Sequence, residues 1–420
     1  MHVVVIGSGL LGVSTAYWLR ELGADVTVID RAPGPGRETS FANGALLTPS
    51  MADPWNAPGV LWKLLGWLGR EDSPMLLRAR ALPGLARWGM RFLRESSEPR
   101  FRANTLANVR LAQYSLASLH ALSANGSMSF DHGEVGTLKL VRDSAAFEAA
   151  RAMAAWLAEH GVKSRALDRE TTVTLEPALR PIAHELVGSI HFPADEHGDA
   201  FRYCESLAAL AARRGAAFRY GTTVTALETH GGRIVRVRTS AGEVAADSVV
   251  VAAGSYSPQL LASTGIRLPV APVKGYSISA PVPAGVTAPI IPILDEELHA
   301  VAVPLGTRLR LAGTAEFAGH DLSVPAARIE NLMHLLSRTY PEIAARVPRE
   351  RIESWTGLRP MSADGVPIVS RTPIENLYLN TGHGHLGWTM ATGSGRALAD
   401  LVMGRAPAID LAPYALDRFN

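Results

Sequence analysis

The sequence predicts an α/β protein: a Rossmann-like nucleotide-binding domain with a mostly parallel sheet, interrupted by an α+β domain built on an antiparallel sheet. Two glycine-rich turns that run into helices support this, one at the start of the chain and one at Thr381 to Leu401. Apolar strands of parallel type also resume after long stretches of different character. We therefore expect a discontinuous nucleotide-binding domain of residues 1–50, 195–265 and 350–420, and an inserted substrate domain of residues 51–194 and 266–349.

The first glycine-rich turn lies between a buried strand and a helix. His2 to Ile6 is a short apolar run that predicts a strand, and Val13 to Leu22 has helical spacing that Gly23 ends. Between them stands Gly7-Ser8-Gly9-Leu10-Leu11-Gly12, and a second strand ends in Asp30, near the spacing of ~20 residues expected for a ribose-binding carboxylate. This β-α-β unit predicts a dinucleotide. It leaves NAD and FAD open, whereas Asp30 would repel the 2′-phosphate of NADP.

The composition narrows the class of protein. Among 420 residues, 47% are hydrophobic and the formal net charge is +2, which gives no indication of nucleic acid binding. The single Cys204 excludes an internal disulfide and a cysteine-based metal cluster, and no metal site is expected. No apolar run approaches the ~20 residues that span a bilayer. We expect a cytoplasmic protein.

The segment 55–95 differs from the rest in being rich in Trp, Leu and Arg. From Leu61 to Arg94 it contains seven basic and two acidic residues, a local charge of +5. Helices of this kind can lie on an anionic membrane surface. The alternative is that they cover the substrate site and bury their Trp and Leu side chains in the core. The sequence therefore leaves two roles open for this segment: a peripheral contact with the cytoplasmic membrane, or a cover over the substrate site.

Further elements follow from periodicity and turn residues. Helical patterns run over Asn104–Ala124, Ala145–His160 and Val324–Arg338, and "HGGR" marks a hairpin turn. Arg267 to Gly319 alternates between polar and apolar residues and predicts antiparallel strands. The stretch "WTGLRPMSADGVPIVS" is expected to be a loop with an apolar exit, because glycine and proline interrupt it.

Several of these motifs occur in an order that resembles the D-amino acid dehydrogenases, FAD-dependent oxidoreductases of the D-amino acid oxidase type. They are the first turn with Asp30, followed by "RETSFANGALLTPS", "PADEHGD", "VVVAAGSYS", "PVKGYS", "GLRPMSADGVPIV" and "LYLNTGHGHLGWTMATGSGRALADL". The resemblance runs from Val3 to about Arg405. It implies a flavoenzyme that oxidises D-amino acids to 2-oxo acids and ammonia, by transfer of a hydride from Cα to flavin N5, and that passes electrons to a quinone-type acceptor.

FAD gives a reason for two glycine-rich turns. The pyrophosphate would bind at the first, and the reduced isoalloxazine, which needs positive potential, at the second, where a helix N-terminus offers about half a positive charge. The resemblance implies cofactor binding by Gly7, Ser8, Gly9, Leu10, Leu11, Gly12, Asp30, Arg31, Arg37, Glu38, Thr39, Ser40, Asn43, Gly44, Ala45, Leu46, Val224, Ala252, Ala253, Gly254, Tyr256, Gly384, His385, Leu386, Gly387, Trp388 and Thr389.

Substrate binding requires a clamp for the carboxylate. The resemblance places it at Arg359 in "GLRP", and the planar fork of arginine suits a carboxylate. Tyr276 in "VKGYS" is expected to donate its hydroxyl to the carboxylate or to form a pocket wall. His385 and His299 are expected to contact substrate. No catalytic acid or base is demanded, because the amine can lose its proton to water.

Three residues depart from the pattern of the family, and alternatives to it remain. Leu46 stands where Gln is usual, Leu298 replaces Tyr, and Pro304 replaces Arg; all three are expected near substrate. A more apolar pocket would suit D-proline or hydroxy-D-proline, which is the first alternative substrate. An oxygen-using amino acid or amine oxidase, an NAD-dependent dehydrogenase and a non-catalytic flavin-binding protein are the other hypotheses.

Overall fold

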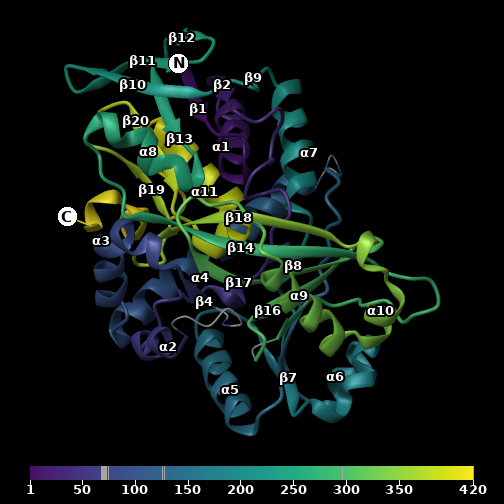
Figure 1. Ribbon diagram of the computed structural model, residues 1–420. Helices are drawn as coiled ribbons and strands as arrows, with labels where there is room; N and C mark the ends of the chain where they lie inside the picture. The colour runs from purple at the N-terminus through teal and green to yellow at the C-terminus, as the bar shows by residue number, and fades with distance from the viewer. Residues whose placement is uncertain (68–72, 74, 125, 127, 296, 420) are drawn as a thin grey trace.

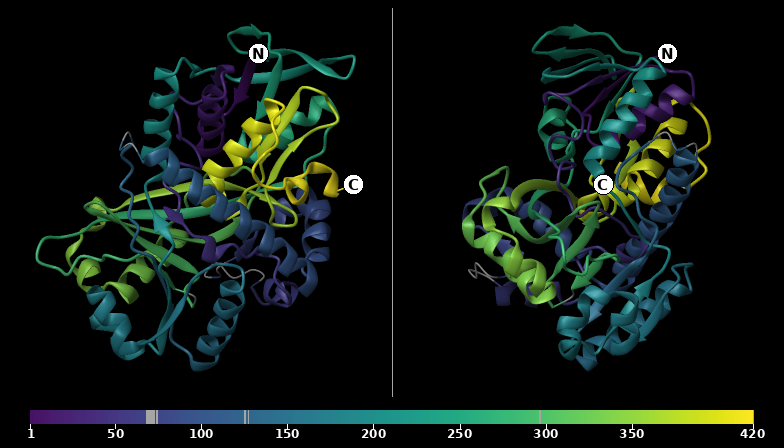
Figure 2. Two further views of the ribbon diagram at one scale, coloured as in Figure 1. Left: turned by 180° about the vertical axis from the view of Figure 1, so that it is seen from behind. Right: turned by 90° about the vertical axis from the view of Figure 1, so that its right-hand side faces the viewer.

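The computed structural model describes residues 1–67, 73, 75–124, 126, 128–295 and 297–419. Figure 1 shows two layered regions, with a mostly parallel sheet and its helices above and a long mixed sheet below. The views in Figure 2 show that the chain passes between them several times, so that segments from the start, middle and end of the sequence meet at their junction.

The upper sheet has six strands in the order β19-β20-β13-β1-β2-β9. All neighbours pair in parallel except β19, which is antiparallel to β20. The strands are β1 (His2–Ile6), β2 (Asp25–Ile29), β9 (Ala217–Arg219), β13 (Ser248–Val251), β19 (Ile368–Arg371) and β20 (Leu377–Thr381).

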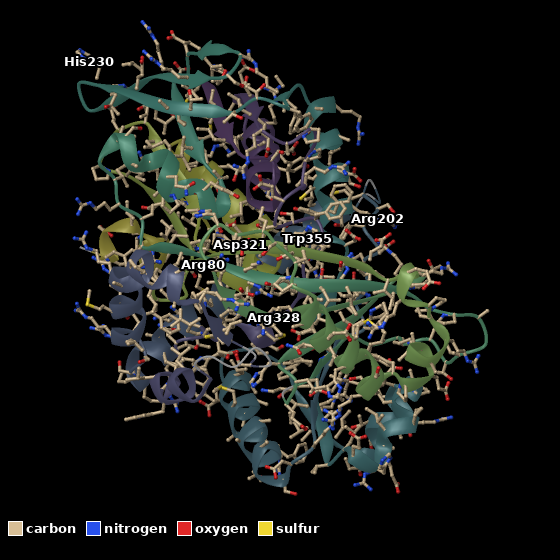
Figure 3. The ribbon with its side chains drawn as sticks, viewed as in Figure 1. Arg80, Arg202, His230, Asp321, Arg328 and Trp355 are labelled. Atoms are coloured by element: carbon tan, nitrogen blue, oxygen red, sulfur yellow. The ribbon has the colours of Figure 1, made fainter. Side chains whose placement is uncertain are left out.

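Both faces of this sheet are buried, which explains the unbroken apolar run of β1. Val3 and Val5 pack beneath four helices, whereas Val4 and Ile6 pack beneath a three-stranded sheet. The helices are α1 (Leu10–Glu21), α4 (Glu98–Ser123), α7 (Ala200–Arg213) and α11 (Gly387–Val402). The small sheet comprises β10 (Val224–His230), β11 (Arg233–Thr239) and β12 (Gly242–Val244), and His230 marks its hairpin tip in Figure 3.

The lower sheet has nine strands and is mostly antiparallel, as predicted for its central part. Its order is β18-β14-β17-β16-β15-β5-β7-β6, with β4 beside β17; the pairs β15–β5 and β17–β4 are parallel. The strands are β4 (Met75–Leu77), β5 (Thr137–Val141), β6 (Arg165–Asp168), β7 (Gly188–Phe192), β14 (Val270–Pro281), β15 (Ile293–Asp295), β16 (Ala300–Leu305), β17 (Arg308–Phe317) and β18 (Glu353–Ser362).

Two helices cover one face of the lower sheet, and the opposite face carries both the site and, beside it, packed side chains of the segment 60–94. α9 (Ala326–Thr339) and α10 (Pro341–Arg346) share a core with β14, β16 and β17. A short pair, β3 (Leu46–Leu47) with β8 (Glu196–His197), links the two regions. The remaining α-helices are α2 (Val60–Trp67), α3 (Leu82–Arg94), α5 (Ser144–Ala158), α6 (Arg169–Leu175) and α8 (Ser257–Leu261).

One predicted element is wrong. The first eight residues of the predicted loop "WTGLRPMSADGVPIVS" belong instead to strand β18, which pairs with β14 from Val270 opposite Ser362 to Ser279 opposite Glu353. Tertiary pairing overrides the local preference of Gly357 and Pro360. The first helix also begins three residues earlier than predicted, at Leu10, and α4 begins at Glu98 because Pro99 occupies its first turn.

The proposed division into domains stays a prediction. Two packing relationships bear on where a domain boundary can lie. The first is that α4, in the range assigned to the substrate domain, shares a core with α11. β18, in the range assigned to the nucleotide-binding domain, is an edge strand of the lower sheet.

Candidate active site

A cavity of about 770 Å³ lies where the two sheets meet. The carboxyl ends of β1, β2 and β13 form one side, and the face of β14, β17 and β18 that points away from α9 forms the other. Ligands of open parallel sheets bind at this edge. Every residue predicted to bind cofactor or substrate lines the cavity except Ser8 and Gly12, whose neighbours Gly7, Gly9 and Leu11 do line it.

The first glycine-rich turn is shaped by close backbone packing. Gly7 has a φ of +105°, and a Cβ on Gly12 would lie 1.8 Å from the carbonyl oxygen of Gly7. Gly9 caps α1 without a side chain, and the first turn of that helix contains no acidic residue. These features suit an anionic group at the helix N-terminus, as the pyrophosphate of FAD requires.

Asp30 holds this turn in place. Its Oδ2 accepts hydrogen bonds from Ser8 N at 2.6 Å and from Ser8 Oγ at 2.7 Å, and its Oδ1 accepts from Ala32 N at 2.8 Å. Asp30 also lines the cavity. Its carboxylate therefore organises the glycine-rich turn in addition to facing the predicted ribose position.

Arg31 and Tyr256 meet across the same end of the cavity. The Arg31 guanidinium lies 3.8 Å from the centre of the Tyr256 ring, and its Nε donates to Glu38 Oε1 at 2.6 Å. Arg37, Val224 and the segment Ala252–Gly254 line this end as well. Together they bring β2, β10 and β13 to one place, as the predicted nucleotide site requires.

The loop 39–46 is fixed onto the lower sheet. Ser277 Oγ donates to the carbonyl of Ala42 at 2.6 Å, and the buried Arg310 donates through Nη1 to the carbonyl of Asn43 at 3.2 Å. Asn43 Oδ1 accepts from Ala45 N at 2.9 Å, which supports the positive φ of 57° at Ala45. At its start, Ser40 Oγ accepts from Leu10 N at 3.2 Å. The predicted cofactor loop therefore connects α1 with the sheet.

The second glycine-rich turn follows β20, as predicted. Gly384 has a φ of +54°, and the turn enters α11 through the 3₁₀ turn Gly384–Leu386. Trp388 Nε1 donates to the carbonyl of Gly198 at 2.9 Å, and Thr389 Oγ1 accepts from Thr48 N at 3.1 Å. These bonds fix the N-terminus of α11 against the cavity, where it can serve an electron-rich ring.

Arg359 projects from β18 into the cavity beside this turn. Its Nη1 donates to the carbonyl of Thr314 at 3.1 Å, and its guanidinium lies 5.5 Å from the centre of the Trp55 ring. No carboxylate of the described residues lies within 4.0 Å of it. Burial lowers the pKa of Arg359 to about 10, so the side chain stays charged at neutral pH. A half-buried cation of this kind suits a carboxylate ligand.

His385 lies next to Arg359 and carries no charge at neutral pH. Burial, together with the neighbouring Arg359, lowers its pKa to about 4. Its ring stacks on Trp55, and Nε2 lies 3.4 Å from the carbonyl oxygen of Met51. His299 lines the cavity from the β15–β16 turn with a φ of +47°. Both histidines therefore line the cavity, and His385 does so beside Arg359.

The hydroxyl of Tyr276 is engaged within the protein. It donates to Glu316 Oε2 at 2.5 Å, and Arg78 Nε donates to Oε1 of the same carboxylate at 2.7 Å. Burial raises the pKa of Glu316, but the bonds from Tyr276 and Arg78 outweigh this and lower it overall. Burial and Glu316 both raise the pKa of Tyr276. Of its two predicted roles, the geometry favours the pocket wall.

The three departures from the family pattern lie in different places. Leu46 lines the cavity. Leu298 instead packs against the core between the lower sheet and α9, and Pro304 lies in β16 away from the cavity lining, so the expectation for these two was wrong. Sequence reasoning missed several lining residues, including Trp55, Gly275, Thr314, Trp355, Gly357 and His383. Trp355 and Gly357 lie within the stretch that was predicted to be a loop.

Comparison with known proteins decides the family. Residues 2–401 match the family described as FAD dependent oxidoreductase. The chain belongs to the FAD-dependent oxidoreductases. The predicted resemblance, the fold class and FAD as cofactor are thereby confirmed. The glycine turns, the uncapped α1 and the N-terminus of α11 are the parts of the cavity that fit this cofactor.

Two relatives of this oxidoreductase cover the whole chain. A D-amino acid dehydrogenase of Paramagnetospirillum magneticum is 44% identical over 100% of this chain and 99% of its own length. Another D-amino acid dehydrogenase, from Agrobacterium fabrum, is 40% identical over 100% of both chains. Among solved structures, L-proline dehydrogenase from P. horikoshii aligns with a TM-score of 0.79 at 19% identity, covering 100% of this chain and 97% of that one. Iminodiacetate oxidase from Chelativorans sp. BNC1 aligns with a TM-score of 0.77 at 25% identity, covering 99% and 98%.

Proposed function

We propose that this protein is a D-amino acid dehydrogenase that converts D-amino acids to 2-oxo acids and ammonia. The observation that carries the proposal is Arg359, a half-buried cation in the cavity that lies beside the second glycine-rich turn and has no acidic partner within 4.0 Å among the described residues. The names of the full-length relatives support the substrate class. FAD, when bound, supplies the acceptor for the two electrons and the hydrogen removed from Cα.

The side chains of the cavity orient the substrate. Thr314 engages one Nη of Arg359, which leaves the rest of the guanidinium for the substrate carboxylate. The neutral His385 adds no second positive charge beside the substrate amine, which must lose its proton before Cα–H is transferred. Trp55 and His385 wall the same region and exclude water. The imine product then hydrolyses in solution.

The carboxylate role of Arg359 is tested with paired substrates. Each D-amino acid is compared with the amine that lacks its carboxylate, for the parent protein and for Arg359→Lys and Arg359→Ala, with a dye as electron acceptor. We expect Arg359→Ala to lower kcat/KM for the amino acid at least about a hundredfold, because a charge-assisted bidentate contact is lost. The amine should be affected little. An equal loss for both substrates would contradict a carboxylate clamp.

D-Proline and hydroxy-D-proline form a second candidate substrate class. Leu46 lines the cavity with an apolar side chain, and Trp55 and Trp355 add aromatic walls. Such walls suit an apolar ring. A ranking of kcat/KM over D-proline, both hydroxy-D-prolines, D-alanine and D-phenylalanine separates the two classes.

We also propose that electrons pass to a quinone at a membrane surface. α2 and α3 expose an apolar–basic face with large apolar side chains among arginines, and Trp62 is 75% exposed there. This face consists of Leu61, Trp62, Leu82, Met90 and Leu93 with Arg87, Arg91 and Arg94. Exposed apolar and basic residues on one surface helix are typical of interfacial binding. Among the described residues, none of the helices combines the length and the hydropathy that a membrane span requires.

Other side chains of the segment 55–95 are buried in the core or line the cavity. Both predicted roles of this segment, membrane contact and cover over the substrate site, therefore have support. Trp88 and Phe92 of α3 are buried against the sheet, and Pro54, Trp55 and Val60 line the cavity. Arg80 is ion-paired with Asp321, which lies beside it in Figure 3. Of the residues counted for the local charge, Arg70, Glu71 and Asp72 lie outside the described residues. The proposed membrane face therefore rests on the outer surface of α2 and α3 alone.

Sedimentation with lipid vesicles tests this face. We expect binding to vesicles that contain anionic phospholipid, weakened by salt, and lost in a Trp62→Ser/Met90→Ser variant. Val235→Ser, which changes an exposed apolar residue on β11, is the matched control and should bind as the parent does. Equal binding by all three proteins would contradict the proposed face.

A further inference from the structure

Two glycines lie opposite each other on the face of the lower sheet that lines the cavity. Gly275 of β14 is paired with Gly357 of β18. Because side chains alternate along a strand, Trp355, Gly357 and Arg359 point to this same face. Trp355, labelled in Figure 3, lies near the middle of the molecule, where the two sheets meet. The pair of glycines leaves a depression in the sheet between the two large side chains.

The guanidinium of Arg359 occupies the place of a missing side chain. A Cβ built on Gly275 would lie 2.3 Å from Nη1, 2.4 Å from Cζ and 2.5 Å from Nη2. On the other strand, a Cβ on Gly357 would lie 2.1 Å from the Trp355 ring. The two glycines thus serve different neighbours: Gly275 makes room for Arg359, and Gly357 makes room for Trp355.

A β-bulge supplies the second contact of the guanidinium. Lys274 pairs with Glu316 and Tyr276 with Gly313, so Gly275 alone faces two residues of β17, Thr314 and Ala315. Thr314 has a φ of +57°, which is rare for a β-branched residue and marks local strain. Bulges of this kind redirect backbone groups beside active sites. Here the carbonyl of Thr314 accepts the hydrogen bond from Arg359 Nη1 at 3.1 Å.

We propose that Gly275 and the Thr314 carbonyl form a seat that positions Arg359 for the substrate carboxylate, with Gly275 as the positioning residue. The proposal rests on the proposed carboxylate role of Arg359. The guanidinium lies over Gly275 and is held at one Nη, while the side chain lines the cavity, so its other N–H groups can bind a carboxylate there. An arginine side chain has many rotamers, and fixing one lowers the entropic cost of binding.

The structure predicts what one added methyl group does. The atoms that a Cβ at position 275 would meet are the far end of a long, flexible side chain, not the backbone. An alanine is therefore accommodated by movement of the guanidinium, and the sheet stays intact. Gly275→Ala should retain FAD and thermal stability while it removes the alignment of Arg359.

A double-mutant cycle on kcat/KM for the best D-amino acid substrate tests this seat. We expect Gly275→Ala to lower kcat/KM by about tenfold or more, mainly through KM, and to have less than a twofold effect when Arg359 is already alanine. Gly357→Ala is the matched control, since it adds the same methyl group on the paired strand and displaces Trp355. Its effect should persist undiminished in the Arg359→Ala protein.

The outcomes separate the inference from the proposed function. If Arg359→Ala itself leaves kcat/KM unchanged, the carboxylate role fails. If Arg359→Ala is impaired and Gly275→Ala is not, or if the effects of the two substitutions simply add, the seat is refuted while the carboxylate role stands.

Chemical rescue provides a test that does not depend on the folding of the Gly275→Ala single variant. In Arg359→Ala the space above residue 275 is open, and added methylguanidinium should restore part of kcat/KM by binding over Gly275 and to the Thr314 carbonyl. The double variant Gly275→Ala/Arg359→Ala should fold equally well, as judged by FAD content and Tm, but should not be rescued. Equal rescue of both proteins would refute the seat.

Discussion

The imidazole of His385 stacks on the indole of Trp55, with ring centres 5.1 Å apart and planes inclined by 18°. The guanidinium of Arg359 lies 5.5 Å from the same indole. Trp55 therefore connects the second glycine-rich turn with the proposed carboxylate clamp, although it belongs to neither motif. It places two of the predicted substrate residues in one aromatic contact.

Replacing Trp55 should impair substrate binding and leave the cofactor in place. Because the stacked pair and the cation–π contact are each worth about 0.5–1.5 kcal/mol, we expect Trp55→Ala to lower kcat/KM for D-amino acids about tenfold. FAD content, measured by absorbance, should be unchanged. Trp62→Ala, in the same segment but 75% exposed, is the control and should leave kcat/KM as in the parent. Equal effects of the two substitutions would contradict a role for Trp55 in the cavity.

The stability of the protein should depend on His385 in mildly acidic solution. Its folded pKa of about 4 lies below the ordinary value of about 6.5, so the unfolded chain binds the extra proton between these two pH values. Stability contributed by the neutral imidazole is therefore lost as the pH falls through this window.

The comparison of His385→Gln with the parent isolates this effect. Asp195, whose pKa is raised to about 7 by burial, acts in the opposite sense, so only the difference between variants is informative. We measure the free energy of unfolding by denaturant titration at several pH values. Between about pH 4 and 6.5, its slope against pH should be smaller in the variant than in the parent, by the amount that corresponds to about one proton. Identical pH profiles would show that His385 is not held neutral.

Gly12 and Gly23 should respond differently to the same substitution. A Cβ on Gly12 would lie 1.8 Å from the carbonyl oxygen of Gly7, whereas one on Gly23 meets nothing within 4 Å. We expect Gly12→Ala to separate α1 from β1 and to yield protein without FAD. Gly23→Ala, at a φ of +85°, should cost about 1–2 kcal/mol of stability and retain FAD. FAD retention by Gly12→Ala would contradict the assigned role of this turn.

Tyr276→Phe distinguishes the pocket wall from a hydroxyl donor. Because the hydroxyl is bonded to the buried Glu316, its removal should lower the free energy of unfolding by about 1–3 kcal/mol and change KM less than twofold. Stability is measured by denaturant titration and KM with a dye acceptor. A large rise in KM with unchanged stability would instead assign the hydroxyl to the substrate.

The first and last motifs were predictable because their signals are local. Gly7, Gly12 and Asp30 stand at spacings that the β-α-β unit dictates, and the structure places them as that unit requires. The second turn at Gly384 likewise follows a buried strand and opens a helix. In both glycine-rich turns, the residues that form the binding motif are close together in the sequence.

The lower sheet contributes residues that no local pattern reveals. Gly275 and Thr314 come together only because β14 and β17 pair with a bulge, and Gly357 stands opposite Gly275 only because β18 is a strand. Glycine and proline in "WTGLRPMS" indicate a loop until the pairing with β14 is known. Trp55 reaches Arg359 from a segment whose composition is compatible both with a membrane-surface helix and with a cover over the substrate site. These relationships depend on tertiary pairing, which sequence spacing does not encode.

The central claim is tested most directly by an anaerobic absorbance titration of the purified holoprotein with D- and L-amino acids, including D-proline and both hydroxy-D-prolines. We predict that the flavin band is bleached by D-amino acids, that the parent protein is reduced far more readily than Arg359→Ala, and that the most effective compound identifies the substrate. A flavin that is bleached only by L-amino acids, or that none of these compounds reduces, would contradict the proposed function.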